Sequence, residues 1–284
     1  MTLRHIHRFH QLDVFTAKAM RGNPLAVVHE AASLSDETMA DFARWTNLSE
    51  TTFLLPPTDP AADYRVRIFT PGGELPFAGH PTLGSCQAWL WAGGQPRQPD
   101  VVVQECGVGQ VRIRRDGTRL AFAAPPLRRT GPLEAGYREA LCAALDLQPH
   151  DVVADQWVDN GPNWCALMLS SAAQVLSLRP DMAALKALQV KLGVIGPQPA
   201  GHETQFEVRA FVPALGIGED PVTGSLNAGL SLWLIGAGLA PAHYVVSQGT
   251  VLGRQGRVHV DRVGDTIWIG GEVAACVDGQ VALP

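Results

Sequence analysis

Hydrophobic and polar residues alternate with the period of a β-strand in several short segments that end at proline or glycine. Residues 63–71 and 205–213 are the clearest examples, because each alternates, carries aromatic and β-branched side chains, and ends in proline. Residues 35–46 and 181–192 instead repeat apolar side chains at helical spacing. The pattern predicts a mixed chain of many strands and a few helices.

Two further predicted helices have no polar face. Residues 81–93 and 221–238 are apolar nearly all round, and each begins with proline and ends at glycine. Since a helix of this kind is buried on every side, we expect each to be the central rod of a curled sheet. Proline at the first helical position would make His80 and Asp220 the N-cap residues.

The sequence that opens these apolar helices occurs twice. His80, Pro81 and the following Gly-Ser align with Asp220, Pro221 and a second Gly-Ser 140 positions later. The two predicted strands upstream share Val, Arg, Phe and Pro at matching positions. The chain therefore contains an internal duplication, and the residues that differ between the copies are candidates for chemistry.

The duplication predicts the fold class. We expect an α/β (α+β) protein of two pseudo-symmetric lobes, each a barrel-like, mostly antiparallel sheet wrapped around a central buried helix. The N-terminal lobe would comprise residues 1–128 and be completed by a C-terminal strand at residues 272–284. The C-terminal lobe would comprise residues 129–271.

Composition narrows the class of function. The chain has 284 residues, 46% of them hydrophobic and 17% charged, and a formal net charge of −5 without a basic cluster. These values are typical of a packed protein and argue against nucleic acid or a membrane as a partner. Because the start of the chain lacks a signal-peptide core, we expect a cytoplasmic protein.

Cysteine and histidine give no metal signal. The five cysteines are widely spaced and form no C-x-x-C pair, which predicts buried free thiols. His5, His7 and His10 lie close together, but alternation along a strand places His10 on the opposite face and no carboxylate follows at ligand spacing. We therefore expect surface histidines and no metal site.

The two apolar helices suggest a binding site. A buried helix start has backbone N–H groups without water, and two such starts facing a common cleft would bind an anion such as a small carboxylate. Gly224 and Ser225 in the first turn would allow close approach of a ligand and add a hydroxyl donor. The structural alternative is that Asp220 only caps its helix and that the glycines only allow close packing.

Two residues of the first half are candidates for proton transfer. His80 is a mediocre helix cap but a good proton carrier near neutral pH. Glu50 lies where residues 35–46 lead into an apolar strand, so it is either a surface acid or a desolvated general base. The matching region around residues 194–195 has no acid. This asymmetry favours proton movement on one face of a substrate, an isomerisation, over a two-base racemase.

Several of these segments together resemble a known family. They are Gly22-Asn-Pro24, Asn47-Leu-Ser-Glu-Thr51, Arg67-Ile-Phe-Thr-Pro71, Gly79-His-Pro-Thr82 and Gly218-Glu-Asp-Pro-Val-Thr-Gly-Ser225. In this order along the chain they resemble the PhzF (phenazine biosynthesis) family. Each motif is short, but the set covers essentially the whole chain.

The resemblance implies a diaminopimelate-epimerase-like fold, a homodimer, and catalysis without a metal or organic cofactor. The family's catalytic residues fall on Glu50, His80 and Asp220. Its substrate-binding positions fall on Asn23, Gly79, Gly224 and Ser225. The phenazine-pathway member isomerises trans-2,3-dihydro-3-hydroxyanthranilate, with the glutamate shuttling a proton along the ring.

The leading hypothesis is a cofactor-independent isomerase of a small carboxylic acid. Related epimerases use paired cysteines, whereas here Cys86 falls inside the first apolar helix and the second copy has no cysteine near its helix start. An epimerase or racemase of an amino or hydroxy acid is an alternative reading. A non-catalytic metabolite-binding protein is another.

Overall fold

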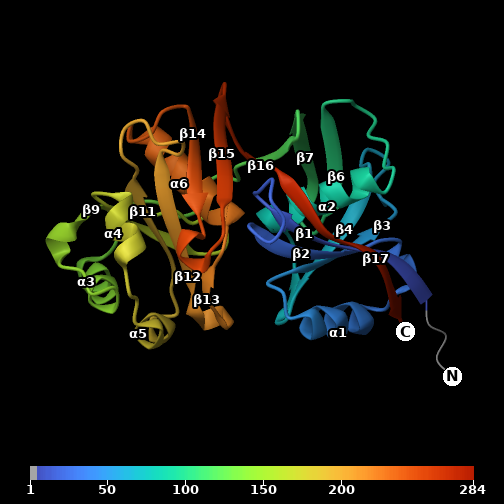
Figure 1. The fold of residues 1–284 in the computed structure, drawn as a ribbon, viewed down its shortest axis with the longest axis horizontal. Coiled ribbons are helices and arrows are strands. Elements are labelled where there is room, and N and C mark those ends of the chain that lie inside the picture. The colour runs from blue at the N-terminus through green and yellow to red at the C-terminus, as the bar shows by residue number, and fades with distance from the viewer. Residues whose placement is uncertain (1–4) are drawn as a thin grey trace. The chain divides into compact units, whose positions relative to one another are not determined.

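The computed structural model describes residues 5–284, and the chain divides into two compact units (Figure 1). Unit 1 consists of the chain up to Ala123 together with Gly270–Pro284, and unit 2 consists of Ala124–Ile269. The last strand therefore belongs with the first part of the chain.

Unit 1 contains nine strands and two α-helices in the part of the chain that the structure describes. The strands are β1 (His5–Val14), β2 (Asn23–Val28), β3 (Thr51–Leu55), β4 (Tyr64–Thr70), β5 (Gly73–Leu75), β6 (Val101–Cys106), β7 (Gly109–Asp116), β8 (Arg119–Ala123) and β17 (Val273–Leu283). The helices are α1 (Asp36–Thr46) and α2 (Gly79–Trp91), with a 3₁₀ turn at Ala31–Ser33.

The strands of unit 1 pair in the order β17, β1, β2, β3, β4, β6, β7, β8, and β5 adds to β4. The β2–β3 and β4–β6 ladders are parallel, and the other ladders in this order are antiparallel. This is the mostly antiparallel sheet that the alternating segments predict.

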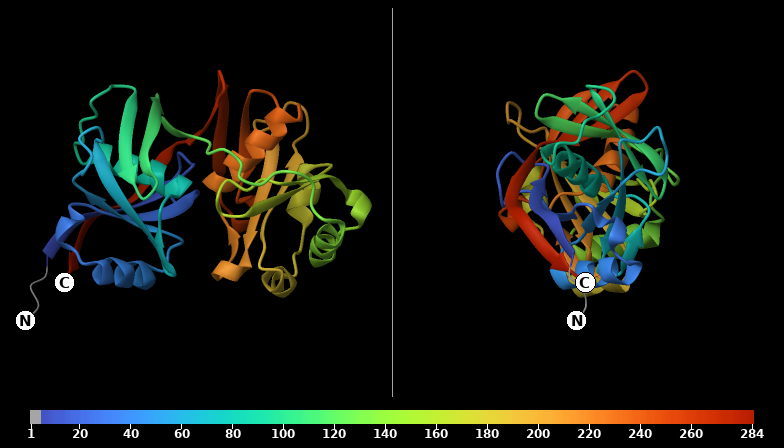
Figure 2. Two further views of the ribbon diagram at one scale, coloured as in Figure 1. Left: turned by 180° about the vertical axis from the view of Figure 1, so that it is seen from behind. Right: turned by 90° about the vertical axis from the view of Figure 1, so that its right-hand side faces the viewer.

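Helix α2 lies inside the curve of this sheet, where it contacts β1, β2, β3, β6, β8 and β17 (Figures 1 and 2). Its first ten residues are buried except Gln87. Gly84 permits the close approach, because a Cβ there would lie 2.5 Å from Leu25 and 2.8 Å from Leu12. Amphipathic α1 covers the other face, with Met39 and Phe42 in an apolar cluster against the sheet.

Unit 2 repeats the arrangement. Its strands are β9 (Val152–Trp157), β10 (Trp164–Leu169), β11 (Lys191–Pro197), β12 (Phe206–Val212), β13 (Ile217–Asp220), β14 (His243–Gln248) and β15 (Gly256–Val263), followed by β16 (Thr266–Gly271) at the boundary. Its α-helices are α3 (Ala135–Ala144), α4 (Ala172–Ser177), α5 (Met182–Ala187) and α6 (Gly224–Gly236), and its 3₁₀ turns are Pro149–Asp151, Pro213–Leu215 and Thr250–Leu252.

The strand pairings of unit 2 follow those of unit 1 step by step. The antiparallel β9–β10, parallel β10–β11, antiparallel β11–β12, parallel β12–β14 and antiparallel β14–β15 ladders match β1–β2, β2–β3, β3–β4, β4–β6 and β6–β7. The predicted α/β fold class is confirmed. The predicted strands at residues 63–71 and 205–213 are β4 and β12.

Two helix predictions were too long. The predicted helix at residues 181–192 stops at Ala187, because Lys191 already begins β11. The predicted helix at residues 221–238 begins only at Gly224. Strand pairing at Lys191 and side-chain hydrogen bonds before Gly224 fix the backbone in a non-helical conformation. Local periodicity does not show such contacts.

The histidine prediction was also wrong in part. His7 and His10 are 4% and 2% exposed, and His29 beside them is 5% exposed. His10 Nδ1 lies 2.8 Å from His29 Nε2, and His7 Nδ1 lies 3.1 Å from the carbonyl oxygen of His29. His29 therefore contacts both His7 and His10 where β1 runs beside the end of β2.

Among the described residues, no helix has both the length and the apolar character of a membrane span.

Candidate functional site

Glu50 is held in the tight connection between α1 and β3. Helix α1 ends at Asn47, which adopts a left-handed conformation with φ 53° and turns the chain. Thr46 Oγ1 and Thr51 Oγ1 then lie 2.9 Å apart and join the end of the helix to the first residue of the strand. Because Thr51 is fully buried, the strand draws the Glu50 side chain away from solvent.

The structure brings Glu50 and His80 together within unit 1. Glu50 Oε2 and His80 Nε2 are 3.5 Å apart, and the two side chains are 16% and 6% exposed. This distance exceeds that of a good hydrogen bond, and such contacts often tighten only when substrate binds. A carboxylate beside an imidazole, both shielded from water, can accept and pass on a proton.

His80 belongs to the first turn of α2 but is not its N-cap, contrary to the sequence prediction. The cap is Ala78, and the N–H of Thr82 donates to the Ala78 carbonyl at 3.1 Å. Pro81 is tolerated as the third helical residue because first-turn N–H groups have no partner within the helix. The positive end of the helix dipole therefore lies at His80, where it favours an anionic group.

Asp220 is likewise not an N-cap. It is the last residue of β13, and the cap of α6 is Thr223. The intervening segment is held by a side chain from another strand: Gln248 Oε1 accepts from the Thr223 N–H at 3.0 Å, and Gln248 Nε2 donates to the Asp220 carbonyl at 3.2 Å. These backbone groups are therefore not available to extend the helix.

The predicted substrate-binding residues fall into the same two units. In unit 1, Gly79 is the first residue of α2, and Asn23 is a buried residue at the start of β2. In unit 2, Gly224 and Ser225 open α6. Ser225 Oγ accepts a hydrogen bond of 2.9 Å from Trp164 Nε1, so its hydroxyl is already oriented by the core. Substrate binding by these residues stays a prediction.

The matching strands locate the counterpart of Glu50. The residue after Glu50 pairs with Phe69, and the residue after Lys191 pairs with Phe211. Because Phe69 and Phe211 occupy the same place in the repeat, Glu50 corresponds to Lys191, not to a residue around 194–195 as expected. The position still carries no acid, so the carboxylate is confined to one copy.

Three other residues near these segments were given no role from the sequence. The buried Ser49 Oγ has no hydrogen-bond partner within residues 5–284, which leaves it able to bind a ligand beside Glu50. Thr223 Oγ1 donates to Asp220 Oδ2 at 2.6 Å. Gln248, the last residue of β14, reaches this segment from a strand that follows α6 in the chain, and no periodic pattern marks it.

Val222 and Leu226 flank the Gly224–Ser225 step of the second motif, and both side chains are fully buried within unit 2. Leu226 packs on Gly193, where a Cβ would lie 2.5 Å from it, and Val222 packs on Gly256 in the same way. These residues build the core that supports the Asp220 segment.

The expectation of buried thiols was wrong for Cys276, which is exposed, and for the half-buried Cys106, but it is confirmed for the other three cysteines. Cys86 in α2 and Cys165 in β10 are fully buried. Burial raises the pKa of both thiols well above the usual range, which keeps them protonated and unreactive. Within residues 5–284, no group of three or more His, Cys, Asp or Glu side chains is arranged to hold a metal ion.

The chain is similar over nearly its full length to known proteins of one family. The family model described as "Phenazine biosynthesis-like protein" (PhzC-PhzF) matches residues 12–279. "Antisense-enhancing sequence 1" of Schizosaccharomyces pombe is 36% identical, over 96% of this chain and 98% of its own. "Trans-2,3-dihydro-3-hydroxyanthranilate isomerase" of Pseudomonas aeruginosa is 33% identical, over 98% of this chain and 100% of its own.

A solved structure extends the likeness to three dimensions. The PhzF-family phenazine biosynthesis protein of Enterococcus faecalis superimposes with a TM-score of 0.81 at 25% identity, over 98% of this chain and 99% of the other. The sequence match and the fold match both cover nearly the full length. The chain therefore belongs to the PhzC-PhzF family of phenazine biosynthesis-like proteins.

Proposed function

We propose that this protein is a cofactor-independent isomerase of a small carboxylic acid in which Glu50 moves the proton. The observation that carries the proposal is the Glu50–His80 pair, 3.5 Å apart and shielded from solvent at the start of α2. The names of several relatives as isomerases support the reaction class.

In this mechanism Glu50 takes a proton from one carbon of the substrate and returns it to another. His80 orients the substrate and assists the transfer through its contact with Glu50. Asp220, carried at the end of β13, is proposed as a further acid–base group. The first-turn N–H groups of α2, beside His80, would hold the substrate carboxylate, as helix N-termini commonly hold anions.

The difference between the two copies supports isomerisation over two-base racemisation. A racemase needs an acid and a base of similar strength on opposite faces of the stereocentre. Glu50 corresponds in the repeat to Lys191, and the buried thiols Cys86 and Cys165 are poor substitutes for a second base. A base with no acidic counterpart in the other copy suits a proton that leaves and returns on one face.

The direct test is Glu50→Gln, which preserves size but removes the base. We expect turnover of a carboxylate substrate to fall about 10²–10⁴-fold, the usual contribution of general acid–base catalysis. Trans-2,3-dihydro-3-hydroxyanthranilate, the compound in the relative's name, is the first candidate in a panel of small unsaturated and chiral carboxylates. Glu37→Gln, at an exposed glutamate in α1, is the matched control.

The substrate's fate in D₂O separates the reaction classes. An isomerase relocates unsaturation, whereas an epimerase labels and inverts one carbon. Because Glu50 and His80 act together in this proposal, Glu50→Gln and His80→Asn should be clearly non-additive. Near-normal turnover in Glu50→Gln would refute the assignment.

A further inference from the structure

The amide of Gln248 is saturated with hydrogen bonds at the segment that carries Asp220. Gln248 is 1% exposed. Its Oε1 accepts from the N–H of Thr223 at 3.0 Å and from Asn227 Nδ2 at 2.8 Å. Its Nε2 donates to the Asp220 carbonyl at 3.2 Å and to Thr223 Oγ1 at 2.9 Å. These four contacts use both donors and both acceptor sites of the amide.

The direction of each hydrogen bond follows from its partners. A backbone N–H only donates, so the atom that faces the N–H of Thr223 must be the oxygen of Gln248. A backbone carbonyl only accepts, so the atom that faces the Asp220 carbonyl must be the nitrogen. Since that nitrogen also donates to Thr223 Oγ1, the hydroxyl hydrogen of Thr223 is directed at Asp220 Oδ2, 2.6 Å away.

We propose that Gln248 is a positioning residue that acts through Thr223 to keep Asp220 Oδ2 a hydrogen-bond acceptor and so fixes the orientation of the Asp220 carboxyl group. The inference rests on the proposed function, since it assigns a positioning residue to the acid–base role of Asp220. A carboxyl group whose two oxygens are distinguished in this way presents one of them in a fixed direction. That fixed direction is what proton transfer to a bound substrate requires.

The backbone around Gln248 is built for close contact with this segment. Gly249 follows it with φ +85°, and a Cβ there would lie 2.6 Å from the carbonyl oxygen of Pro221. Any larger residue would push β14 away from the Asp220 segment. The glycine therefore allows the amide of Gln248 to reach both Asp220 and Thr223.

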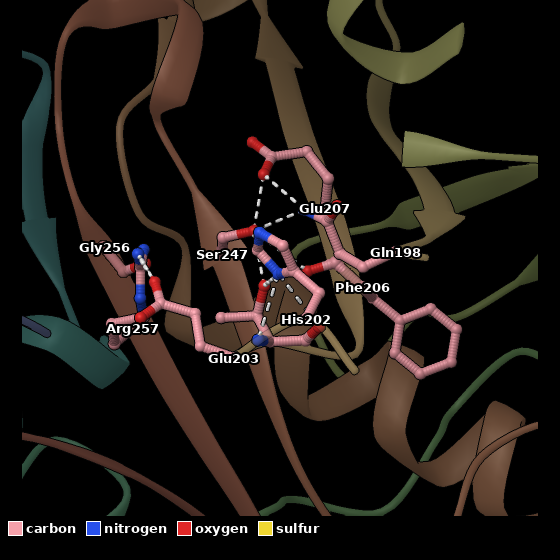
Figure 3. Close-up of polar contacts among 9 residues, drawn as sticks. Gln198, His202, Glu203, Phe206, Glu207, Ser247, Gly256 and Arg257 are labelled. Carbon is pink, nitrogen blue, oxygen red and sulfur yellow. Dashed lines mark hydrogen bonds and ion pairs between the residues drawn. The ribbon is translucent and has the colours of Figure 1, made fainter. Parts of the chain in front are cut away.

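Strand β14 is also anchored one residue before Gln248 (Figure 3). Ser247 Oγ bonds to the Glu207 carboxylate, donates to the Phe206 carbonyl at 3.1 Å, and lies 3.3 Å from Gln198 Nε2. Glu207 is 1% exposed, and burial raises the pKa of its carboxyl group. This buried cluster holds β14 against β12 through Ser247, whose side chain lies on the opposite face of the strand from that of Gln248. It therefore limits the movement of Gln248.

Two substitutions remove the directional bond in different ways. Gln248→Glu keeps the shape but replaces the donating nitrogen with an oxygen, which draws the Thr223 hydroxyl hydrogen away from Asp220. Thr223→Val keeps a similar side-chain size but removes the hydroxyl, and with it both the bond to Asp220 Oδ2 and the acceptor of Gln248 Nε2. Thr223→Ser retains it. Gln104→Glu is the matched control, because Gln104 is a fully buried amide of unit 1 that donates to Thr82 Oγ1 at 3.1 Å.

With a turned-over substrate, we expect Thr223→Val and Gln248→Glu to lower kcat about 10- to 100-fold, the range for a lost hydrogen bond to a charged group. KM should change less than kcat, and Thr223→Ser should stay near wild type. A drop in Thr223→Ser as large as that in Thr223→Val would overturn the role of the hydroxyl.

A second measurement does not depend on turnover. In protein labelled with ¹³C-aspartate, the Asp220 carboxyl signal is identified by its loss in Asp220→Asn and followed against pH. Because a hydrogen bond to the charged form favours that form, the signal should titrate at higher pH in Thr223→Val and Gln248→Glu than in wild type, and should not move in Gln104→Glu.

The two measurements separate the two claims. An Asp220 signal that titrates identically in wild type and Thr223→Val overturns the positioning role, whether or not a substrate has been found. If the wild-type protein converts no carboxylate in the panel, the proposed function is rejected. If the Asp220 signal still titrates at higher pH in Thr223→Val and Gln248→Glu than in wild type, the positioning role is supported.

Discussion

The buried histidines of unit 1 should make the protein lose stability in mild acid. His29 is 5% exposed and lies 2.8 Å from His10, which is 2% exposed. Burial, and then the neighbouring His10 and Arg8, lower the pKa of His29 from 6.5 to about 4. Asp278 acts in the opposite direction but does not outweigh them. The folded protein therefore keeps His29 neutral at a pH where the unfolded chain protonates it.

The sign and size of the effect follow from linkage. A folded-state pKa below the unfolded value means that the unfolded state binds more protons, so stability is present above pH 6.5 and falls as the pH drops toward 4. At pH 5 the unfolded histidine lies about 1.5 pH units below its pKa, which corresponds to about 2 kcal/mol. We expect His29 to account for about this much of the loss between pH 7.5 and pH 5.

The assay compares urea unfolding of wild type and His29→Gln at the two pH values. The neutral variant should lose about 2 kcal/mol less than wild type between pH 7.5 and pH 5, because the groups that do not contact His29 titrate alike in both. His150→Gln, at a histidine whose side chain is 84% exposed, should lose as much as wild type. Equal pH dependence in wild type and His29→Gln would refute the reasoning.

Two stability predictions follow from matched sites, each measured as the free energy of urea unfolding. Arg209→Met should cost about 3–5 kcal/mol, since Arg209 and its partner Glu219 are only 4% and 6% exposed. Arg67→Met should cost about 1 kcal/mol, because the partners of Arg67 are solvent-exposed. Similar costs for the two variants would contradict this prediction. Gly84→Ala should cost about 1–3 kcal/mol through overpacking. Gly136→Ala, in open space in α3, should be neutral or stabilising. A larger cost for Gly136→Ala than for Gly84→Ala would be inconsistent with the packing of α2.

Much of the fold could be predicted because the duplication gives two independent samples of one pattern. The strands around Phe69 and Phe211 alternate in the same way and occupy equivalent positions in the two units. The all-apolar character of α2 and α6 indicated burial, and most residues of both helices are buried. These features depend on local periodicity, which a sequence displays directly.

The candidate site was less predictable because tertiary contacts decide its details. The proximity of Glu50 and His80 was expected from the family resemblance, but the helix start at Gly79 was not expected from Pro81. Gln248 determines where α6 begins, although it follows that helix in the chain. A contact between residues so far apart leaves no periodic trace in either segment.

The strand order of unit 1 has a consequence for how the chain is made. Strand β17 completes unit 1 by pairing with β1 along its whole length, yet it is synthesised after the whole of unit 2. Unit 2 is one continuous segment and can fold during synthesis, whereas β1 keeps an unpaired edge until β17 has been made. Such edges invite aggregation. Truncation within β17 would therefore damage unit 1, which carries Glu50, and leave unit 2 intact, although unit 2 lies closer to β17 in the sequence than most of unit 1 does.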